Sequence, residues 1–140
     1  MKYVFLDTNI LLDIIEGRQK FLLASSNVFD LGIRGEIQMY ATPLTFANCV
    51  YIARKNVGYE KAIKGLKALK KYLRTASMDD AQVTDAINSN MPDFEDMLQY
   101  EAARASKCDV IITRDKNRHF PQDGEVPVMS PESFLKNFCE

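Results

Sequence analysis

Two aspartates follow the two most apolar short runs of the sequence. Asp7 comes immediately after residues 2–6, and Asp115 comes two residues after the end of the run 110–113. Short, wholly apolar runs are typical of strands that are buried on both faces, as in a parallel sheet. In open α/β sheets, ligands bind beyond the carboxyl ends of the strands. We therefore expect both carboxylates to project from one edge of a parallel sheet.

Two further aspartates, Asp93 and Asp96, lie three residues apart in a predicted helix that leads into the second apolar run. This spacing puts them on one helix face, which could turn toward the same sheet edge. Converging carboxylates repel one another unless a cation lies between them, and all-oxygen ligands favour Mg²⁺ or Mn²⁺ over zinc or copper. Because such ions activate water and stabilise a leaving oxygen, the pattern indicates phosphodiester hydrolysis without a protein nucleophile.

The predicted elements alternate between strands and helices. Apolar residues at helical spacing predict helices over residues 7–16, 20–33, 43–55, 59–74, 79–88, 93–106 and 131–138. Short apolar runs predict strands at 2–6, 38–41, 76–78, 110–113 and 127–129. This alternation is typical of an α/β fold, a three-layer α/β/α sandwich around a short parallel sheet of four or five strands. The length of 140 residues fits a single domain, residues 1–140.

The composition is that of an ordinary soluble protein, with 46% hydrophobic and 26% charged residues. No apolar run reaches the roughly 18 to 20 residues that cross a bilayer. The N-terminal segment has no small-residue cleavage site, so we expect a cytoplasmic protein without membrane association.

The single histidine, His119, argues against His-rich zinc chemistry and is expected in a surface loop. Three cysteines lack metal-ligand spacing and are expected to be reduced, two of them buried: Cys49, Cys108 and Cys139.

Charge is segregated along the chain although the net charge is only −1. Residues 54–74 contain eight basic residues and one acid, whereas residues 77–103 contain seven acids and neither lysine nor arginine. A lysine face on a predicted helix is usually only solvated. It could also guide an RNA backbone toward an acidic site. The candidate RNA contacts are Lys61, Lys64, Lys67 and Lys71.

Taken together, these motifs resemble the PIN-domain family. VFLDTNILLDII (residues 4–15) resembles the family's opening motif, residues 93–115 are similar to its second half, and VPVMSPESFL (126–135) resembles its last strand and closing helix. The resemblance covers nearly the whole chain. It implies a PIN-like fold and an endoribonuclease that uses Mg²⁺ or Mn²⁺ to cleave RNA. It also implies the toxin of a toxin–antitoxin pair, with a cognate antitoxin protein as partner and a homodimer as the usual assembly.

The resemblance implies a catalytic, metal-binding role for three residues, Asp7, Asp96 and Asp115. It implies supporting roles for Thr8, Asn9, Asn48, Asp93, Thr113 and Asn117. One position departs from the family pattern: Asn48 stands where the family carries a glutamate, so an oxygen ligand is kept but a charge is lost. Asp93 could compensate from one helical turn away. The segment 115–120 is one residue longer than the usual ending, which leaves the roles of Asn117 and His119 open.

Other interpretations remain open at this stage. Asp7 and Asp93 are both well placed to be ordinary helix N-caps. Asn48 permits a PIN-like fold that is catalytically weak and only binds RNA or protein. A third interpretation is another phosphoryl-transfer enzyme. A haloacid-type phosphatase, however, needs an acid where this chain has Asn9, and a receiver domain needs adjacent acids and a late lysine that the sequence lacks.

Overall fold

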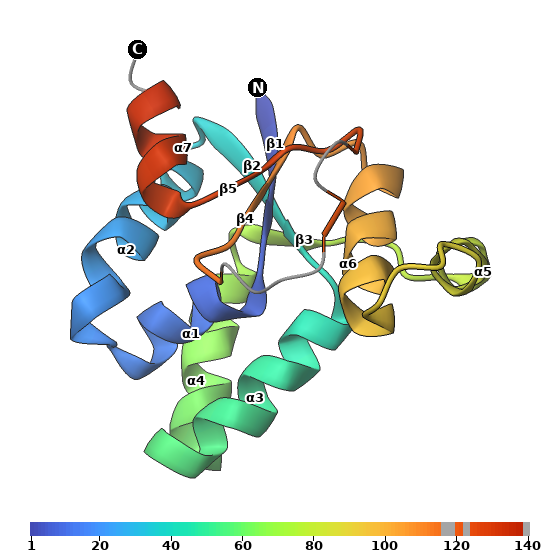
Figure 1. Ribbon diagram of the computed structural model, residues 1–140. Coiled ribbons are helices and arrows are strands. Elements are labelled where there is room, and N and C mark those ends of the chain that lie inside the picture. The colour runs from blue at the N-terminus through green and yellow to red at the C-terminus, as the bar shows by residue number, and fades with distance from the viewer. Residues whose placement is uncertain (116–119, 122–123, 139–140) are drawn as a thin grey trace.

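A parallel sheet forms the centre of the protein (Figure 1). The computed structural model describes residues 1–115, 120–121 and 124–138. Within these residues five strands pair in parallel, in the order β3-β2-β1-β4-β5. Their bounds are Lys2–Leu6 (β1), Ile37–Ala41 (β2), Leu73–Thr75 (β3), Val110–Ile112 (β4) and Val128–Met129 (β5). The predicted sheet of four or five parallel strands is therefore confirmed.

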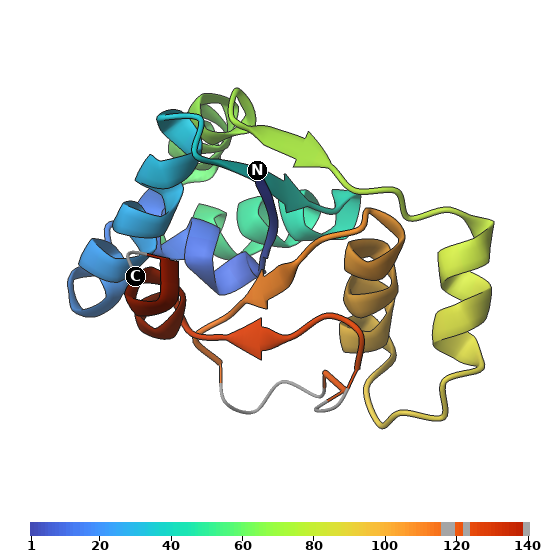
Figure 2. The ribbon, with the colours of Figure 1, turned by 90° about the horizontal axis from the view of Figure 1, so that it is seen from above.

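Helices lie on both sides of this sheet (Figure 2). One side carries α1 (Thr8–Glu16), α2 (Gln19–Ile33), α3 (Pro43–Val57), α4 (Tyr59–Lys70) and α7 (Pro131–Phe138). The other side carries α5 (Asp80–Ile87) and α6 (Phe94–Ala105). The three-layer α/β/α arrangement is thus confirmed. In the described part of the chain, no helix is both long and apolar enough to cross a membrane.

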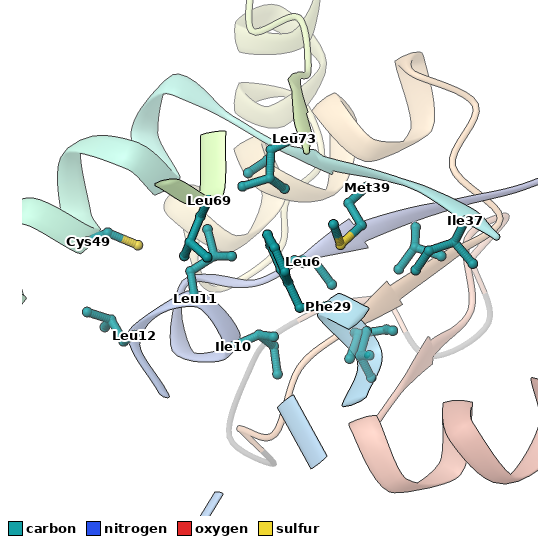
Figure 3. Close-up of a cluster of buried hydrophobic side chains, with 14 of the residues drawn as sticks. Leu6, Ile10, Leu11, Leu12, Phe29, Ile37, Met39, Cys49, Leu69 and Leu73 are labelled. Carbon is teal, nitrogen blue, oxygen red and sulfur yellow. The ribbon is translucent and has the colours of Figure 1, made fainter. Parts of the chain in front are cut away.

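The strand β1 separates two hydrophobic clusters. Val4 and Leu6 pack into the cluster beneath α1, α2 and α7, whereas Phe5 between them packs into the cluster beneath α5 and α6. All three side chains are fully buried, which is why this run is wholly apolar and does not alternate. Figure 3 shows Leu6, Ile10 and neighbouring side chains of the first cluster converging between the helices and the sheet. Each such aliphatic side chain contributes about 1.5–3 kcal/mol relative to an exposed one.

The helix α1 begins and ends as the sequence predicts. Asp7 has extended backbone angles, and its side chain accepts the N–H of Thr8 as an N-cap. Gly17 adopts a left-handed conformation with φ of 64°, and its N–H bonds to the Asp13 and Ile14 carbonyls. A residue with a side chain is strained at this φ, so glycine is the favoured C-cap.

The predicted helix over 59–74 and the predicted strand at 76–78 are wrong at their junction. The helix α4 ends at Lys70, and Leu73 begins β3. Leu73 continues the helical spacing of the preceding leucines, so the periodicity of apolar residues places it in the helix. In the structure it pairs with Met39 of β2, so sheet pairing overrides the helical pattern. The other helix and strand ends lie within three residues of those predicted.

Gly32 lies in the last turn of α2, which ends at Ile33 as predicted. A Cβ atom at position 32 would collide with the Met39 side chain. The glycine therefore permits a close approach of α2 to β2.

Candidate active site

The carboxyl ends of β1 and β4 lie side by side, because the strands pair in parallel with Leu6 beside Ile112. The backbone N–H of Asp7 extends this pairing and donates to the Ile112 carbonyl oxygen at 3.0 Å. Asp7 and Thr113 directly follow these two strands, so they occupy neighbouring places at this edge. Ligands bind beyond this edge in open α/β sheets.

Asp7 is both a helix cap and part of this sheet edge. Its Oδ1 accepts the Thr8 N–H at 2.8 Å, which is the N-cap role left open by the sequence. Its Oδ2 accepts the Thr113 hydroxyl at 2.7 Å and lies 3.4 Å from Asn9 Nδ2. The side chain is 0% exposed. A carboxylate removed from water needs such donors to offset its lost hydration, so its orientation is fixed from two elements.

Thr113 connects three neighbours through one hydroxyl. Its Oγ1 donates to Asp7 and accepts from Asn9 Nδ2 and from the Asp115 N–H, each at 3.1 Å. One donated and two accepted bonds exhaust the capacity of a hydroxyl. In addition, Asn9 Oδ1 accepts the Arg114 N–H at 3.3 Å. The start of the segment after β4 is therefore tied to the start of α1.

Asp115 is exposed and lies beside a surface hollow of about 610 Å³. This volume is within the range of about 300–1,000 Å³ typical of small-molecule sites. Aromatic and apolar groups share the hollow with hydroxyl and carboxylate groups. Its described lining is Phe21, Thr113, Arg114, Asp115, Phe120, Pro121, Val128, Met129, Ser130 and Glu132.

Asp93 and Asp96 stand at the beginning of α6, and this end of the helix lies toward the carboxyl edge of the sheet (Figure 1). Asp93 Oδ1 accepts the Asp96 N–H at 3.0 Å, so Asp93 is an N-cap, as one interpretation of the sequence expected. Asp96 is buried, with 1% of its surface exposed. A carboxylate in the first turn of a helix is stabilised by the helix dipole. The Asp93 cap thus fixes the backbone of the helical turn that carries Asp96.

Side-chain hydrogen bonds join α3 to α6 beside the site. Thr42 and Thr45 each place a hydroxyl on Gln99 Oε1, at 2.8 and 3.2 Å, and all three side chains are fully or almost fully buried. One turn later in α3 and one turn earlier in α6, Asn48 Nδ2 donates to Glu95 Oε1 at 3.0 Å. The Asn48 side chain is half-buried. Gln99 and Glu95 went unpredicted, because a single sequence does not show which helices face each other.

Some predicted site residues lie elsewhere or outside the described chain. The helix α4, which packs on α1 and α3, carries three of the lysines, and the fourth directly follows it. All four are exposed to solvent: Lys61, Lys64, Lys67 and Lys71. Asn117 and His119 lie outside the residues that the structure describes. Their predicted roles, and the RNA contacts of the lysines, stay predictions.

An ion pair that sequence reasoning missed lies next to this edge. Arg114 Nη2 and Nε lie 2.8 and 2.9 Å from the two carboxylate oxygens of Asp13, whose side chain is 0% exposed. One signal was present in the sequence, because Asp13 interrupts the apolar spacing of the predicted helix 7–16. A fully buried acid requires a cationic or multiple hydrogen-bond partner. The sequence did not indicate which residue supplied it.

The side chains at this edge offer oxygen ligands, which suits a hard divalent cation better than zinc or copper. Among the described residues, no group of three or more His, Cys, Asp or Glu side chains stands in an arrangement that could hold a metal ion. Thr8 Oγ1, next to Asp7 in sequence, is buried and has no hydrogen-bond partner in the described part of the chain. The donor chemistry therefore fits Mg²⁺ or Mn²⁺, although the described acids do not form a closed cage.

Two cysteines are buried thiols, as predicted. Burial, reinforced by the negative charge of Asp7, raises the pKa of Cys49 to about 12. Burial, reinforced by Asp109, likewise raises the pKa of Cys108 to about 12. Both thiols therefore stay protonated at neutral pH and are poor nucleophiles. The third cysteine, Cys139, lies outside the described residues.

The chain is similar to several known proteins along most of its length. It is 26% identical over 148 residues to "Ribonuclease VapC1" of Aquifex aeolicus (strain VF5), covering 96% of this chain and 94% of that one. Among solved structures, it is similar to VapBC2 from Rickettsia felis bound to a promoter DNA fragment, with TM-score 0.68, 16% identity, and 91% and 98% of the two chains covered.

Two further solved structures share the fold. One is VapC20 of Mycobacterium tuberculosis, described as a toxin that cleaves the sarcin-ricin loop, with TM-score 0.68, 11% identity, and 89% and 98% coverage. The other is a toxin–antitoxin complex from Klebsiella pneumoniae, with TM-score 0.63, 20% identity, and 91% and 97% coverage.

The family assignment rests on the sequence match to a family model. The model described as "PIN domain" matches residues 3–117, which is well over half of the chain. This stretch includes both ends of the candidate site, from Asp7 to Asp115. The chain belongs to the PIN domain family.

Proposed function

We propose that this protein is a metal-dependent endoribonuclease, and that residues 1–140 form one catalytic domain. The observation that carries the proposal is the fully buried Asp7 carboxylate, which is fixed at the joined ends of β1 and β4 by the Thr113 hydroxyl. An oriented, desolvated carboxylate at this edge suits metal-assisted phosphodiester hydrolysis. The likeness to a relative named a ribonuclease supports the same activity.

In this proposal Mg²⁺ or Mn²⁺ binds to oxygen atoms of Asp7, Asp96 and Asp115. When bound, the ion lowers the pKa of a water molecule and stabilises the negative charge that develops on the phosphate. Thr8 N–H and Thr113 Oγ1 orient Asp7, and the Asp93 cap orders the first turn of α6 beneath Asp96. Asn9 and Asn48 support the site with amide groups, without adding charge.

The surface around these acids suits a single-stranded RNA. The hollow beside Asp115 offers Pro121 and Val128 as apolar surface for a base, and Ser130 and Glu132 as polar groups. The exposed lysines of α4 supply positive charge for the phosphate backbone as it approaches. Asp7, Asp96 and Asp115 would hold the metal beyond the strand ends, and the metal would supply an activated water for hydrolysis, so that no covalent intermediate on the protein is needed.

We further propose that the protein is the toxin of a toxin–antitoxin pair. The similar structures from Rickettsia felis and Klebsiella pneumoniae are a VapBC complex and a toxin–antitoxin complex, which supports an antitoxin partner here. A toxin that cleaves cellular RNA has to be held inactive by such an inhibitor. Homodimerisation and a cytoplasmic location belong to the same proposal.

The test is cleavage of a mixed structured RNA by purified protein in Mg²⁺, in Mn²⁺ and in EDTA, beside an Asp7→Asn variant. Cleavage should require the metal and should fall at least a hundredfold in the variant. The matched control is Asp30→Asn, since Asp30 is an exposed acid of α2 paired with Arg34. Cleavage that persists in EDTA, or in Asp7→Asn, would overturn the proposal. Metal-independent RNA binding without cleavage would instead favour a binding module.

A further inference from the structure

The carboxylate of Asp13 is a buried charge that the proposed reaction does not use. It is 0% exposed and lies in the middle of α1. Arg114 pairs with both of its oxygens at 2.8–3.1 Å, and Ser25 Oγ of α2 donates to its Oδ2 at 2.8 Å. Arg18 Nη1 lies further away, 3.7 Å from Oδ1. Asp13 is therefore the centre of a cluster that joins α1, α2 and the segment after β4.

The guanidinium of Arg114 is held on two sides. Its edge binds Asp13 in a two-pronged arrangement through Nε and Nη2. Its face lies over the ring of Phe21 in α2, with the central carbon 3.8 Å from the ring centroid. Both contacts depend on a planar, delocalised cation, which a lysine ammonium does not reproduce. These two contacts hold the guanidinium in place and pair its charge with Asp13, although the side chain remains 21% exposed and lines the hollow beside Asp115.

Arg114 lies in the sequence between Thr113 and Asp115, the two residues of this segment that belong to the candidate site. Thr113 precedes it and bonds to Asp7, while Asp115 follows it and donates its N–H back to Thr113 Oγ1 at 3.1 Å. The N–H of Arg114 itself donates to Asn9 Oδ1 at 3.3 Å. Thr113 is thus attached to Asp7, Arg114 is attached to Asp13 and Asn9, and Asp115 is attached to Thr113. A shift of Arg114 moves both neighbours.

We infer that Arg114 is a positioning residue of the active site. Its pairing with Asp13 anchors residues 113–115 to α1, so that Thr113 reaches Asp7 and the Asp115 carboxylate keeps its place at the edge. This inference rests on the proposed ribonuclease function. It adds that the catalytic acids are set by the ion pair between Arg114 and the buried Asp13, neither of which is among the proposed metal ligands. Displacements near 1 Å can reduce a rate about a hundredfold, so the anchor is a strong determinant of activity.

The test compares Arg114→Lys with Arg18→Lys. Both arginines face the same buried carboxylate, with side chains 21% and 29% exposed, but only Arg114 adjoins Thr113 and Asp115. Each variant keeps its charge, which limits the loss of stability. Hydrogen exchange at the amides of residues 114 and 115 reports the positioning directly. Single-turnover cleavage of RNA in saturating Mn²⁺ reports its consequence.

In Arg114→Lys we expect exchange at these two amides to become at least tenfold faster and the cleavage rate to fall about tenfold to a hundredfold, with little change in KM. In Arg18→Lys we expect both to stay within threefold of wild type. Equal effects of the two variants on rate and exchange would mean that the pair is only structural, and would overturn the inference. Faster exchange with an unchanged rate would overturn it as well.

The two proposals fail in different ways. If wild-type protein does not cleave RNA, the proposed function fails. The exchange comparison then still decides whether Arg114 anchors residues 113–115. If Arg114→Lys does not fold, an Asp13→Asn variant replaces it. Its amide keeps one acceptor for Arg114 and one contact to Ser25, and it should show the same faster exchange at residues 114 and 115.

Discussion

The hydroxyl of Thr113 lies 2.7 Å from Asp7 Oδ2, although the two residues are 106 positions apart in the sequence. Parallel pairing of β1 with β4 creates this contact, since Leu6 and Ile112 are partners and the next residues lie beyond the strand ends. The same hydroxyl accepts bonds from Asn9 and from Asp115. The orientation of the first candidate catalytic acid therefore depends on the chain that carries the last one.

A Thr113→Val substitution tests this dependence. Valine keeps the shape of threonine but removes the hydroxyl, so Asp7 loses a buried donor worth about 1.5–3 kcal/mol for a charged acceptor. If the reaction requires this orientation, the cleavage rate should fall by about tenfold to a hundredfold. Thr113→Ser restores the hydroxyl and should recover most of the rate. A valine variant with wild-type activity would contradict the role given to Thr113.

The fold followed from the sequence because its main signals are local. The wholly apolar runs at β1 and β4, and Gly17 after α1, each have one strong structural interpretation. The failure at β3 has the opposite cause. Leu73 continues the helical spacing of α4, and only its pairing with Met39 decides that it belongs to a strand. That pairing is a property of the assembled sheet and has no local trace in the sequence.

The candidate site was predictable to the extent that strand ends define it. Parallel strands bring Asp7 and the residues after Ile112 to one edge, independently of how the helices pack. The residues that orient this edge were not predictable. Arg114 with Asp13, and Asn48 with Glu95, each join elements whose mutual packing no local pattern reveals. A single sequence therefore indicates the chemistry of a site more readily than the contacts that support it.

An Asn48→Asp substitution tests whether the contact between α3 and α6 tolerates an added negative charge and whether it binds Mg²⁺. The amide of Asn48 now donates to Glu95 Oε1 at 3.0 Å, and an aspartate would place a second carboxylate there. Like charges at this distance repel, so we expect a lower Tm for the variant than for wild type above about pH 5. If the junction contributes to a metal site, Mg²⁺ should raise the Tm of the variant more than that of wild type.

The control for this experiment is Asn48→Ala, which removes the hydrogen bond without adding charge. Its Tm should not depend on Mg²⁺ more strongly than that of wild type. Thermal unfolding at pH 7, without Mg²⁺ and with about 10 mM Mg²⁺, a concentration above the Kd of weak divalent-cation sites, separates the variants. Equal Mg²⁺ effects in all three proteins would place Asn48 and Glu95 outside the metal site.

The lysine face of α4 predicts salt-dependent RNA binding. A quadruple variant with alanine at Lys61, Lys64, Lys67 and Lys71 should bind single-stranded RNA more weakly, and its affinity should depend less steeply on salt. Each phosphate that the variant no longer neutralises should reduce the slope of log K against log salt by about 0.7. Lys70 is left intact, because its Nζ donates to the Leu73 carbonyl at 3.1 Å. Fluorescence anisotropy over a salt series with the Asp7→Asn protein as background measures the slope.

A matched variant with alanine at four other exposed lysines removes the same charge elsewhere: Lys2, Lys20, Lys107 and Lys136. If the slope falls equally in both quadruple variants, the effect reflects net charge only. The RNA path along α4 would then be wrong.

The buried thiols predict a loss of stability at alkaline pH. The pKa of Cys49 is raised from 9.0 to about 12 by burial, so above pH 9 the unfolded chain releases a proton that the folded chain retains. The stabilising effect is complete below pH 9 and is lost as the pH rises toward 12. The free energy of unfolding, measured in urea between pH 8 and about 10.5, a range that spans the usual thiol pKa, should therefore fall. It should fall less steeply in Cys49→Ala, and an identical pH slope would contradict the burial of this thiol.

The most direct test of the central claim is the single-turnover rate of RNA cleavage as a function of Mg²⁺ concentration, for wild type and for Asp96→Asn. Asp96 is a buried acid at the first turn of α6, and Glu101 on the same helix is a matched control, with 9% of its surface exposed and a pairing to Arg104. A metal-binding role predicts that Asp96→Asn loses at least a hundredfold in rate and requires more Mg²⁺, while Glu101→Gln keeps the wild-type rate and Mg²⁺ dependence. An Asp96→Asn protein that cleaves RNA at the wild-type rate, with an unchanged Mg²⁺ requirement, would contradict the proposed active site.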